Sequence, residues 1–130
     1  GAAGGLAAGL VAFSGAQIVA GIDYLAKVVG LRDRIAEADV VITGEGRLDY
    51  QSAFGKTVAG VASISRELGK PCLVIGGTVD GSDFARLIPG LTHVESAAPV
   101  TLPISEAISN AVPLVHSATG RILRRYQTEQ

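Results

Sequence analysis

The sequence has no methionine or tryptophan, only one cysteine and two histidines. A single cysteine, Cys72, cannot form an internal disulfide, which fits a reducing compartment, so we expect a cytoplasmic protein. Cys72 lies in an apolar run, which favours an inert core thiol over a nucleophile. His93 and His116 do not have the spacing of zinc ligands, and we expect both to be structural.

Charge is also scarce. The net charge is −1 and no basic stripe is present, which argues against a nucleic-acid partner. The first 22 residues carry no charge, but they are mostly Gly and Ala, too weakly hydrophobic for membrane insertion, and they lack the basic start of a signal peptide. Gly5 and Gly9 form a GxxxG pattern, which predicts helix packing through small residues in a soluble core.

Apolar residues make up 48% of the 130 residues, enough for one domain with a real core. Runs rich in β-branched residues predict a strand from 39 to 43 that is buried on both faces, a strand from 72 to 77 and a weaker one from 92 to 98. Helical periodicity is present over 6–15, 21–29, 31–38, 57–68 and 103–126, and Pro113 should kink or divide the last helix. This alternation predicts an α/β fold with an open parallel sheet and flanking helices.

Polar side chains follow the first predicted strand. We expect Glu45 in the loop just past that strand, between Gly44 and Gly46, where a ligand can come close to the backbone. Arg47 offers a rigid fork of donors for a carboxylate or phosphate. Glu45 and Asp49 could bind Mg²⁺. The alternative is that Glu45, Arg47 and Asp49 neutralise one another across the loop.

Lys56 lies at the start of the next predicted helix, where a bound anion would offset its unfavourable position in the helix dipole. It could also simply point into water. The residues Gly55-Lys56-Thr57 are not a P-loop, because that motif needs glycine where Tyr50 stands. Gly76 and Gly77 lie at the end of the second predicted strand, as Gly44 does in the first, so the loops after both strands should open on the same sheet edge. Thr78, Asp80 and Asp83 either contribute there or form a turn.

The segments "GAAGGLAAGL", "ADVVITGEGRLDYQSAFGKTVAGVA" and "KPCLVIGG" together resemble the C-terminal part of the type-1 glycerate kinase family. The resemblance implies phosphorylation of a hydroxyl of D-glycerate with ATP and Mg²⁺ as cofactors. It also implies a flavodoxin-like half of a two-domain kinase built around a cleft. On this basis we expect one α/β domain or fragment over 1–130, with a helical segment over 1–37 lining the cleft and a βαβαβα unit over 38–130.

The resemblance assigns roles only to the positions that match. It implies catalytic roles for Glu45, Arg47, Asp49 and Lys56, metal binding by Glu45 and Asp49, and substrate or nucleotide binding by Gly1, Gly4, Gly5, Gly44, Gly46, Gln51, Gly55, Gly76 and Gly77. Two departures stand out. Thr57 and Val58 replace the small residue and proline that often follow the family's Gly-Lys pair, and the family's N-terminal "DSFKG" block is absent from this sequence. We therefore expect the chain alone to be inactive.

Two other classes of function remain open. One is a non-catalytic α/β module that binds a nucleotide or a carboxylate through the same loops. The other is a structural fragment that forms a homodimer to cover a missing sheet edge.

Overall fold

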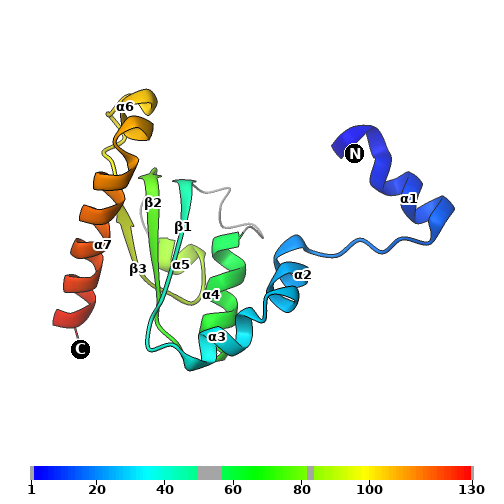
Figure 1. The fold of residues 1–130 in the computed structure, drawn as a ribbon, viewed down its shortest axis with the longest axis horizontal. Helices are drawn as coiled ribbons and strands as arrows, with labels where there is room; N and C mark the ends of the chain where they lie inside the picture. Colours follow the sequence, from blue (N-terminus) through cyan, green and yellow to red (C-terminus); the bar gives the residue numbers. More distant parts are fainter. Residues whose placement is uncertain (1, 50–56, 82–83, 130) are drawn as a thin grey trace.

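The structure is a computed structural model that describes residues 2–49, 57–81 and 84–129. Figure 1 shows a small sheet with helices on both sides and a separate N-terminal helix. Along the chain the elements are η1 (Ala2–Gly5), α1 (Leu6–Ser14), α2 (Gly21–Val28), α3 (Leu31–Glu37), β1 (Val41–Leu48), α4 (Thr57–Glu67), β2 (Cys72–Val79), α5 (Phe84–Leu87), β3 (Leu91–Ser96), α6 (Ile104–Ser109) and α7 (Ala111–Thr128).

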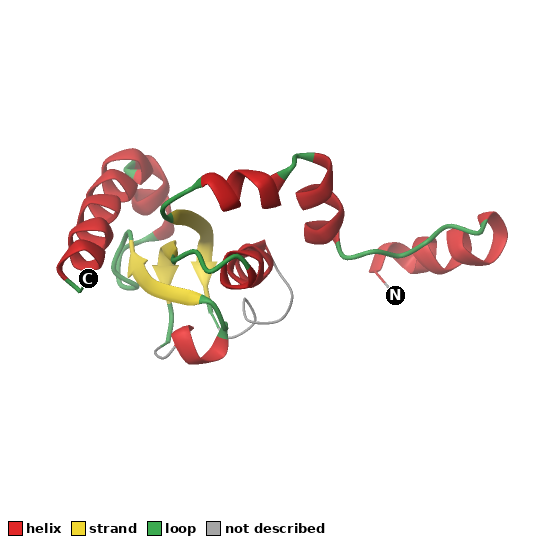
Figure 2. Ribbon diagram, turned by 90° about the horizontal axis from the view of Figure 1, so that it is seen from below, coloured by secondary structure: helices red, strands yellow, loops and turns green. Residues whose placement is uncertain are grey.

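The sheet has three strands in the order β1-β2-β3, and both pairs are parallel. This confirms the predicted α/β class with an open parallel sheet and flanking helices. Figure 2 shows α4 on one side of the sheet and α7 on the other. The register places Val41 opposite Cys72 and Glu45 opposite Gly76.

Two apolar clusters hold these layers together. The larger lies between the sheet and the helices α4 and α5, and its buried residues are Ile35, Leu48, Val58, Val61, Ala62, Cys72, Val74, Phe84, Ile88 and Leu91. The smaller lies between the sheet and α7, and its buried residues are Leu73, Ile75, Ala97, Ala118 and Ile122. Alternate residues of β2 therefore serve the two clusters, as the two-residue period of a strand requires.

The single cysteine lies in the larger cluster. The Cys72 side chain is completely buried, and this burial raises the pKa of its thiol against a smaller opposing effect of the hydrogen bond with Ser65. A thiol with a raised pKa forms little thiolate, so the predicted inert role fits. His93 is also buried, and its Nε2 lies 3.4 Å from Oε2 of Glu129 at the end of α7, which is consistent with a structural role.

The first strand differs from the prediction in two ways. It was expected to be buried on both faces, and this is wrong, because residues along β1 alternate between partly buried and exposed, with Ile42 43% exposed. The reason is that β1 lies at an edge of the sheet while α7 packs on β2 and β3. The strand also runs to Leu48, well beyond its apolar run, because backbone pairing with β2 continues through its glycines.

Glycine and proline mark the helix ends largely as predicted. Gly15 ends α1 in the left-handed conformation, with φ of 66°. The last helix is divided at Asn110, and Pro113 falls in the first turn of α7, where a missing backbone N–H costs little.

The N-terminal third has two parts. Helix α2 packs on α4, where the side chain of Ile22 presses so closely on Gly60 that a Cβ there would overlap it. In both views α1 lies well apart from the sheet, and Phe13 on it is 93% exposed. No residue of α1 is buried, so the predicted core packing through Gly5 and Gly9 is wrong within this chain. Within the described ranges, no helix combines the length and the hydropathy needed to cross a membrane.

The contact of α7 with the sheet can be tested by truncating one side chain. Ile122 is completely buried, so Ile122→Ala should lower the free energy of unfolding by about 2–5 kcal/mol through lost burial and a residual cavity. Val112→Ala on the same helix, where Val112 is 82% exposed, should change it by less than about 0.5 kcal/mol. Urea unfolding of both variants measures the difference, and equal midpoints would show that α7 does not pack as described.

Candidate functional site

The polar residues predicted to lie in a loop lie mostly within the sheet. Glu45 and Arg47 belong to β1, where they pair with Gly76 and Thr78 of β2, and Asp49 follows directly after the strand. The prediction that Glu45 lies in a loop past the strand is therefore wrong. Gly76 and Gly77 likewise lie inside β2, so the two strands carry their glycines side by side.

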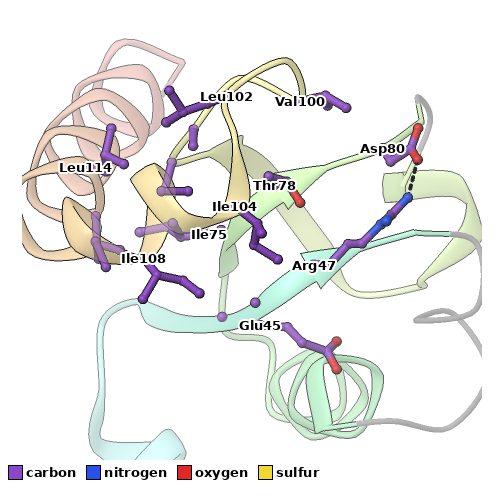
Figure 3. A pocket seen from close by; sticks show the side chains of 18 of the residues that line it. Glu45, Arg47, Ile75, Thr78, Asp80, Val100, Leu102, Ile104, Ile108 and Leu114 are labelled. Atoms are coloured by element: carbon purple, nitrogen blue, oxygen red, sulfur yellow. Dashed lines mark hydrogen bonds and ion pairs between the residues drawn. The ribbon is translucent and has the colours of Figure 1, made fainter.

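The register decides which way the β1 side chains point. Thr43 and Glu45 pair with Val74 and Gly76, so they share the face covered by α4. Gly44 pairs with Ile75 and lies on the α7 side. Figure 3 shows the Glu45 carboxylate directed toward α4, while Arg47 extends toward Asp80.

A groove of about 1000 Å³ lies beside β1, between the sheet and helices α6 and α7. Its walls are largely aliphatic, and its polar groups gather at the end where β1 and β2 finish. The residues that line it are Ile42, Thr43, Gly44, Glu45, Gly46, Arg47, Ile75, Gly77, Thr78, Asp80, Ala97, Ala98, Val100, Leu102, Ile104, Ala107, Ile108, Ala111, Leu114, Val115 and Thr119.

Arg47 is held by two carboxylates. Its Nη2 donates to Oδ2 of Asp80 at 2.7 Å, and its Nε lies 3.8 Å from Oδ2 of Asp49. The Arg47 side chain is 62% exposed, so these pairs stand in a wet, screened environment. The expected alternative, in which the charges neutralise one another, thus applies to Arg47 and Asp49, with Asp80 as the stronger partner.

Glu45 stands apart from this pairing. Its Oε2 is buried and has no hydrogen-bond partner among the residues that the structure describes. A buried carboxylate oxygen without a partner is costly, since it loses its hydration and gains nothing in return. The oxygen therefore suits a hydroxyl donor or a cation that is brought to the site.

The same oxygen bears on whether the residues present fit the predicted Mg²⁺ site. In the part of the chain that is described, no three His, Cys, Asp or Glu side chains come together as a metal cluster. Mg²⁺, however, usually takes one or two carboxylates and fills its remaining positions with waters and phosphate oxygens. Glu45 fits such an ion that arrives with a nucleotide. Asp49 would have to give up its contact with Arg47 before it could bind the same ion.

The glycines around the site differ in whether a side chain could replace them. A Cβ on Gly44 would lie 2.7 Å from the carbonyl oxygen of Ile75, and a Cβ on Gly77 would overlap the carbonyl oxygen of Gly46. Both positions need glycine because the two backbones approach closely. Gly46 is different, since an added Cβ would meet no atom of the described residues within 4 Å.

Two described glycines among the predicted site residues lie away from the groove. Gly4 and Gly5 lie in η1, at the far end of the chain from the sheet edge in Figure 1. Their ligand-binding role stays a prediction. Gly1, Gln51, Gly55 and Lys56 lie outside the described residues.

Sequence reasoning missed the aliphatic wall of the groove. Ile104 and Ile108, which belong to the helical periodicity predicted over 103–126, lie on α6 and are 78% and 69% exposed. The available signal was the apolar composition of residues 99–108, which showed that this segment has an apolar surface but not what covers it.

Fold and site together define a parallel α/β protein in which Arg47, Asp49 and Asp80 come together at the carboxyl ends of β1 and β2. The sequence matches the glycerate kinase family over residues 1–127. The chain therefore belongs to the glycerate kinase family.

Individual relatives agree with this placement. The chain is 35% identical over 122 residues to a glycerate kinase of Halalkalibacterium halodurans, covering 94% of this chain and 32% of the relative. It is 43% identical over 79 residues to glycerate 2-kinase of Escherichia coli, covering 61% of this chain and 21% of the relative. A crystal structure assigned as glycerate kinase 2 of Salmonella typhimurium LT2 matches with a TM-score of 0.71 and 35% identity, covering all of this chain and 33% of that one. The matches thus cover a third or less of the length of these relatives.

The different roles of the glycines give a stability test. Gly44→Ala should lower the free energy of unfolding by about 1–3 kcal/mol, because its methyl group forces β1 and β2 apart. Gly46→Ala should change it by less than about 0.5 kcal/mol, because its methyl group meets no atom of the described residues within 4 Å. Denaturant titration of both variants decides, and a large loss for Gly46→Ala would show that its site is closed.

Proposed function

We propose that this chain is the part of a glycerate kinase that holds the reacting groups at the ends of β1 and β2. The reaction is transfer of a phosphoryl group from ATP to a hydroxyl of D-glycerate. Membership of the family supports the reaction. The buried Oε2 of Glu45, which has no hydrogen-bond partner among the described residues, is the single observation that supports this location.

Phosphoryl transfer depends mainly on positioning and on stabilising charge. In this proposal Glu45 accepts a hydrogen bond from an O–H donor, either a glycerate hydroxyl or a water bound to Mg²⁺. Arg47 exchanges its exposed contact with Asp80 for the glycerate carboxylate or a phosphate, both of which match its planar fork. The Mg²⁺ ion that comes with ATP would neutralise negative charge on the phosphates.

Lys56 and Asp49 complete the proposed set. Lys56 would offset charge on the transferring group, a role that rests on the family motif. Asp49 would orient Arg47, since its Oδ2 lies 3.8 Å from the Arg47 Nε. Because the chain spans about a third of its relatives, the 130-residue chain alone should give no turnover with ATP and glycerate.

Substitutions in a full-length kinase that contains this segment test the site. Arg47→Ala and Asp49→Asn should each lower kcat/KM by roughly 10²-fold or more, the loss typical of removing one preorganised charged group. The matched control is Arg32→Ala, which removes an arginine of similar exposure (55% against 62%) whose Nη1 lies 2.7 Å from Oε2 of Glu67, neither of which lines the groove. The control should keep kcat/KM within about twofold.

Steady-state kinetics and thermal unfolding of all three variants give the answer. The site proposal fails if Arg47→Ala and Asp49→Asn keep near-normal kinetics with an intact fold. If calorimetry shows that the full-length protein binds ATP or glycerate but does not convert them, a non-catalytic binding module explains the site instead.

A further inference from the structure

Asp80 holds the arginine of the proposed site. The Arg47 Nη2 donates to Oδ2 of Asp80 at 2.7 Å, whereas Oδ2 of Asp49 lies 3.8 Å from the Arg47 Nε. Figure 3 shows Arg47 extending toward Asp80, while the Glu45 carboxylate points toward α4. Asp80 lies outside the sequence block that contains Arg47 and Asp49, so only the geometry indicates what it does.

The backbone around this ion pair is fixed. Leu48 follows Arg47, Val79 precedes Asp80, and these two neighbours pair across β1 and β2. Leu48 is completely buried in the larger cluster, and Val79 packs against that cluster. The backbone N–H of Asp80 also donates to the carbonyl oxygen of Leu48 at 2.8 Å. Because both neighbours are anchored, Asp80 stays within reach of Arg47 although its own side chain is 52% exposed.

The shape of the guanidinium makes Asp80 a competitor for a bound carboxylate. An arginine binds a carboxylate through two parallel N–H bonds, either from Nε and Nη2 or from Nη1 and Nη2. Both arrangements include Nη2, the nitrogen of Arg47 that donates to Asp80. A ligand that makes two bonds to Arg47 must therefore approach the Asp80 carboxylate or replace it.

The charge around Arg47 favours a ligand group with a single negative charge. Asp49 and Asp80 contribute −2 and Arg47 contributes +1, so the three side chains carry −1 together. Among the described residues that line the groove, Arg47 is the one cation. A terminal phosphate group carries about −1.5 to −2 near neutral pH, against −1 for a carboxylate. Because Coulomb repulsion scales with charge, Asp80 repels such a phosphate roughly 1.5 to 2 times as strongly as a carboxylate.

We propose that Asp80 is a specificity-determining residue of the site. It occupies Arg47 as an internal carboxylate and makes the arginine accept the carboxylate of D-glycerate in preference to a phosphate of ATP. This role rests on the proposed function, in which Arg47 binds an anionic group of a substrate. Asp80 thereby decides between the two anionic groups that the proposed function leaves open for Arg47.

The exchange at Arg47 affects binding and not the chemical step. When the glycerate carboxylate takes the Nη2 donor, Asp80 turns toward water, and one charge-assisted hydrogen bond replaces another. The net gain at Arg47 is small, so the affinity for glycerate depends on its other contacts. Asp80 is displaced equally in the substrate complex and in the transition state, so it raises KM and leaves kcat unchanged.

Asp80→Asn in a full-length kinase that contains this segment tests this role. The amide keeps the shape of the side chain and removes its charge. The KM for D-glycerate should therefore fall about three- to fivefold, the scale of an exposed ion pair, while kcat and the KM for ATP stay unchanged. Asp80→Glu keeps the charge and should keep the wild-type KM values. Steady-state kinetics with each substrate varied in turn measures these values, and calorimetry with D-glycerate alone should show the same fall in Kd without turnover.

Glu67→Gln is the matched control. Glu67 forms an ion pair of the same 2.7 Å length with Arg32, its side chain is 48% exposed against 52% for Asp80, and neither Glu67 nor Arg32 lines the groove. This variant should leave kcat and both KM values unchanged. In an Arg47→Ala background, Asp80→Asn should no longer lower the KM for D-glycerate, because Asp80 acts through Arg47. The melting temperatures of Asp80→Asn and Glu67→Gln should stay within a few degrees of the wild type.

Several results would overturn the role of Asp80. An unchanged KM for D-glycerate in Asp80→Asn, or an equal fall with Glu67→Gln or in the Arg47→Ala background, would show that the carboxylate does not compete for Arg47. A raised KM for D-glycerate or a lowered kcat would show that Asp80 orients Arg47 instead. A fall in the KM for ATP alone would assign Arg47 to a phosphate.

The same kinetics separate this role from the proposed function. A severe loss of kcat/KM in Arg47→Ala together with an unchanged Asp80→Asn would count against the role of Asp80 alone. Near-normal kinetics of Arg47→Ala would remove the proposed function and the role of Asp80 with it.

Discussion

The parallel pairing of β1 with β2 is the constraint on which the site depends. It places Glu45 opposite Gly76 and Arg47 opposite Thr78, two residues before Asp80. The pairing is close because Gly44 and Gly77 have no side chains to meet the neighbouring carbonyl groups. The same close pairing therefore brings the charged side chains together and leaves a strip of the sheet without side chains beside them.

Much of this fold follows from local patterns in the sequence. Helix α4 occurs within a residue of the predicted range, and the division of the last helix occurs three residues before the proline that predicted it. These features depend on side-chain periodicity and on backbone restrictions at glycine and proline, which act over a few residues. The family can also be recognised from the sequence, because each of its motifs is a continuous stretch of the chain.

The rest depends on contacts that no local pattern encodes. The apolar run stops at Thr43, yet β1 continues to Leu48 because backbone hydrogen bonds to β2 do not require apolar side chains. Arg47 and Asp80 are 33 residues apart in the sequence and meet only through the register of two strands. Likewise, the spacing of Ile104 and Ile108 shows that α6 has an apolar face, but not whether the chain itself covers it.

The ion pairs of Arg47 and the isolation of Glu45 have opposite energetic meanings. Exposed pairs such as Arg47 with Asp80 contribute about 0–1 kcal/mol, so an incoming carboxylate or phosphate can replace Asp80 at little cost. Glu45 is different, because its buried Oε2 has no donor among the described residues, and such an oxygen costs roughly 1–3 kcal/mol or more until a ligand supplies a donor. Mutual neutralisation in the described chain is thus compatible with ligand binding at Arg47. Glu45 is the residue at which binding would gain most, since a donor there removes a cost that the fold already bears.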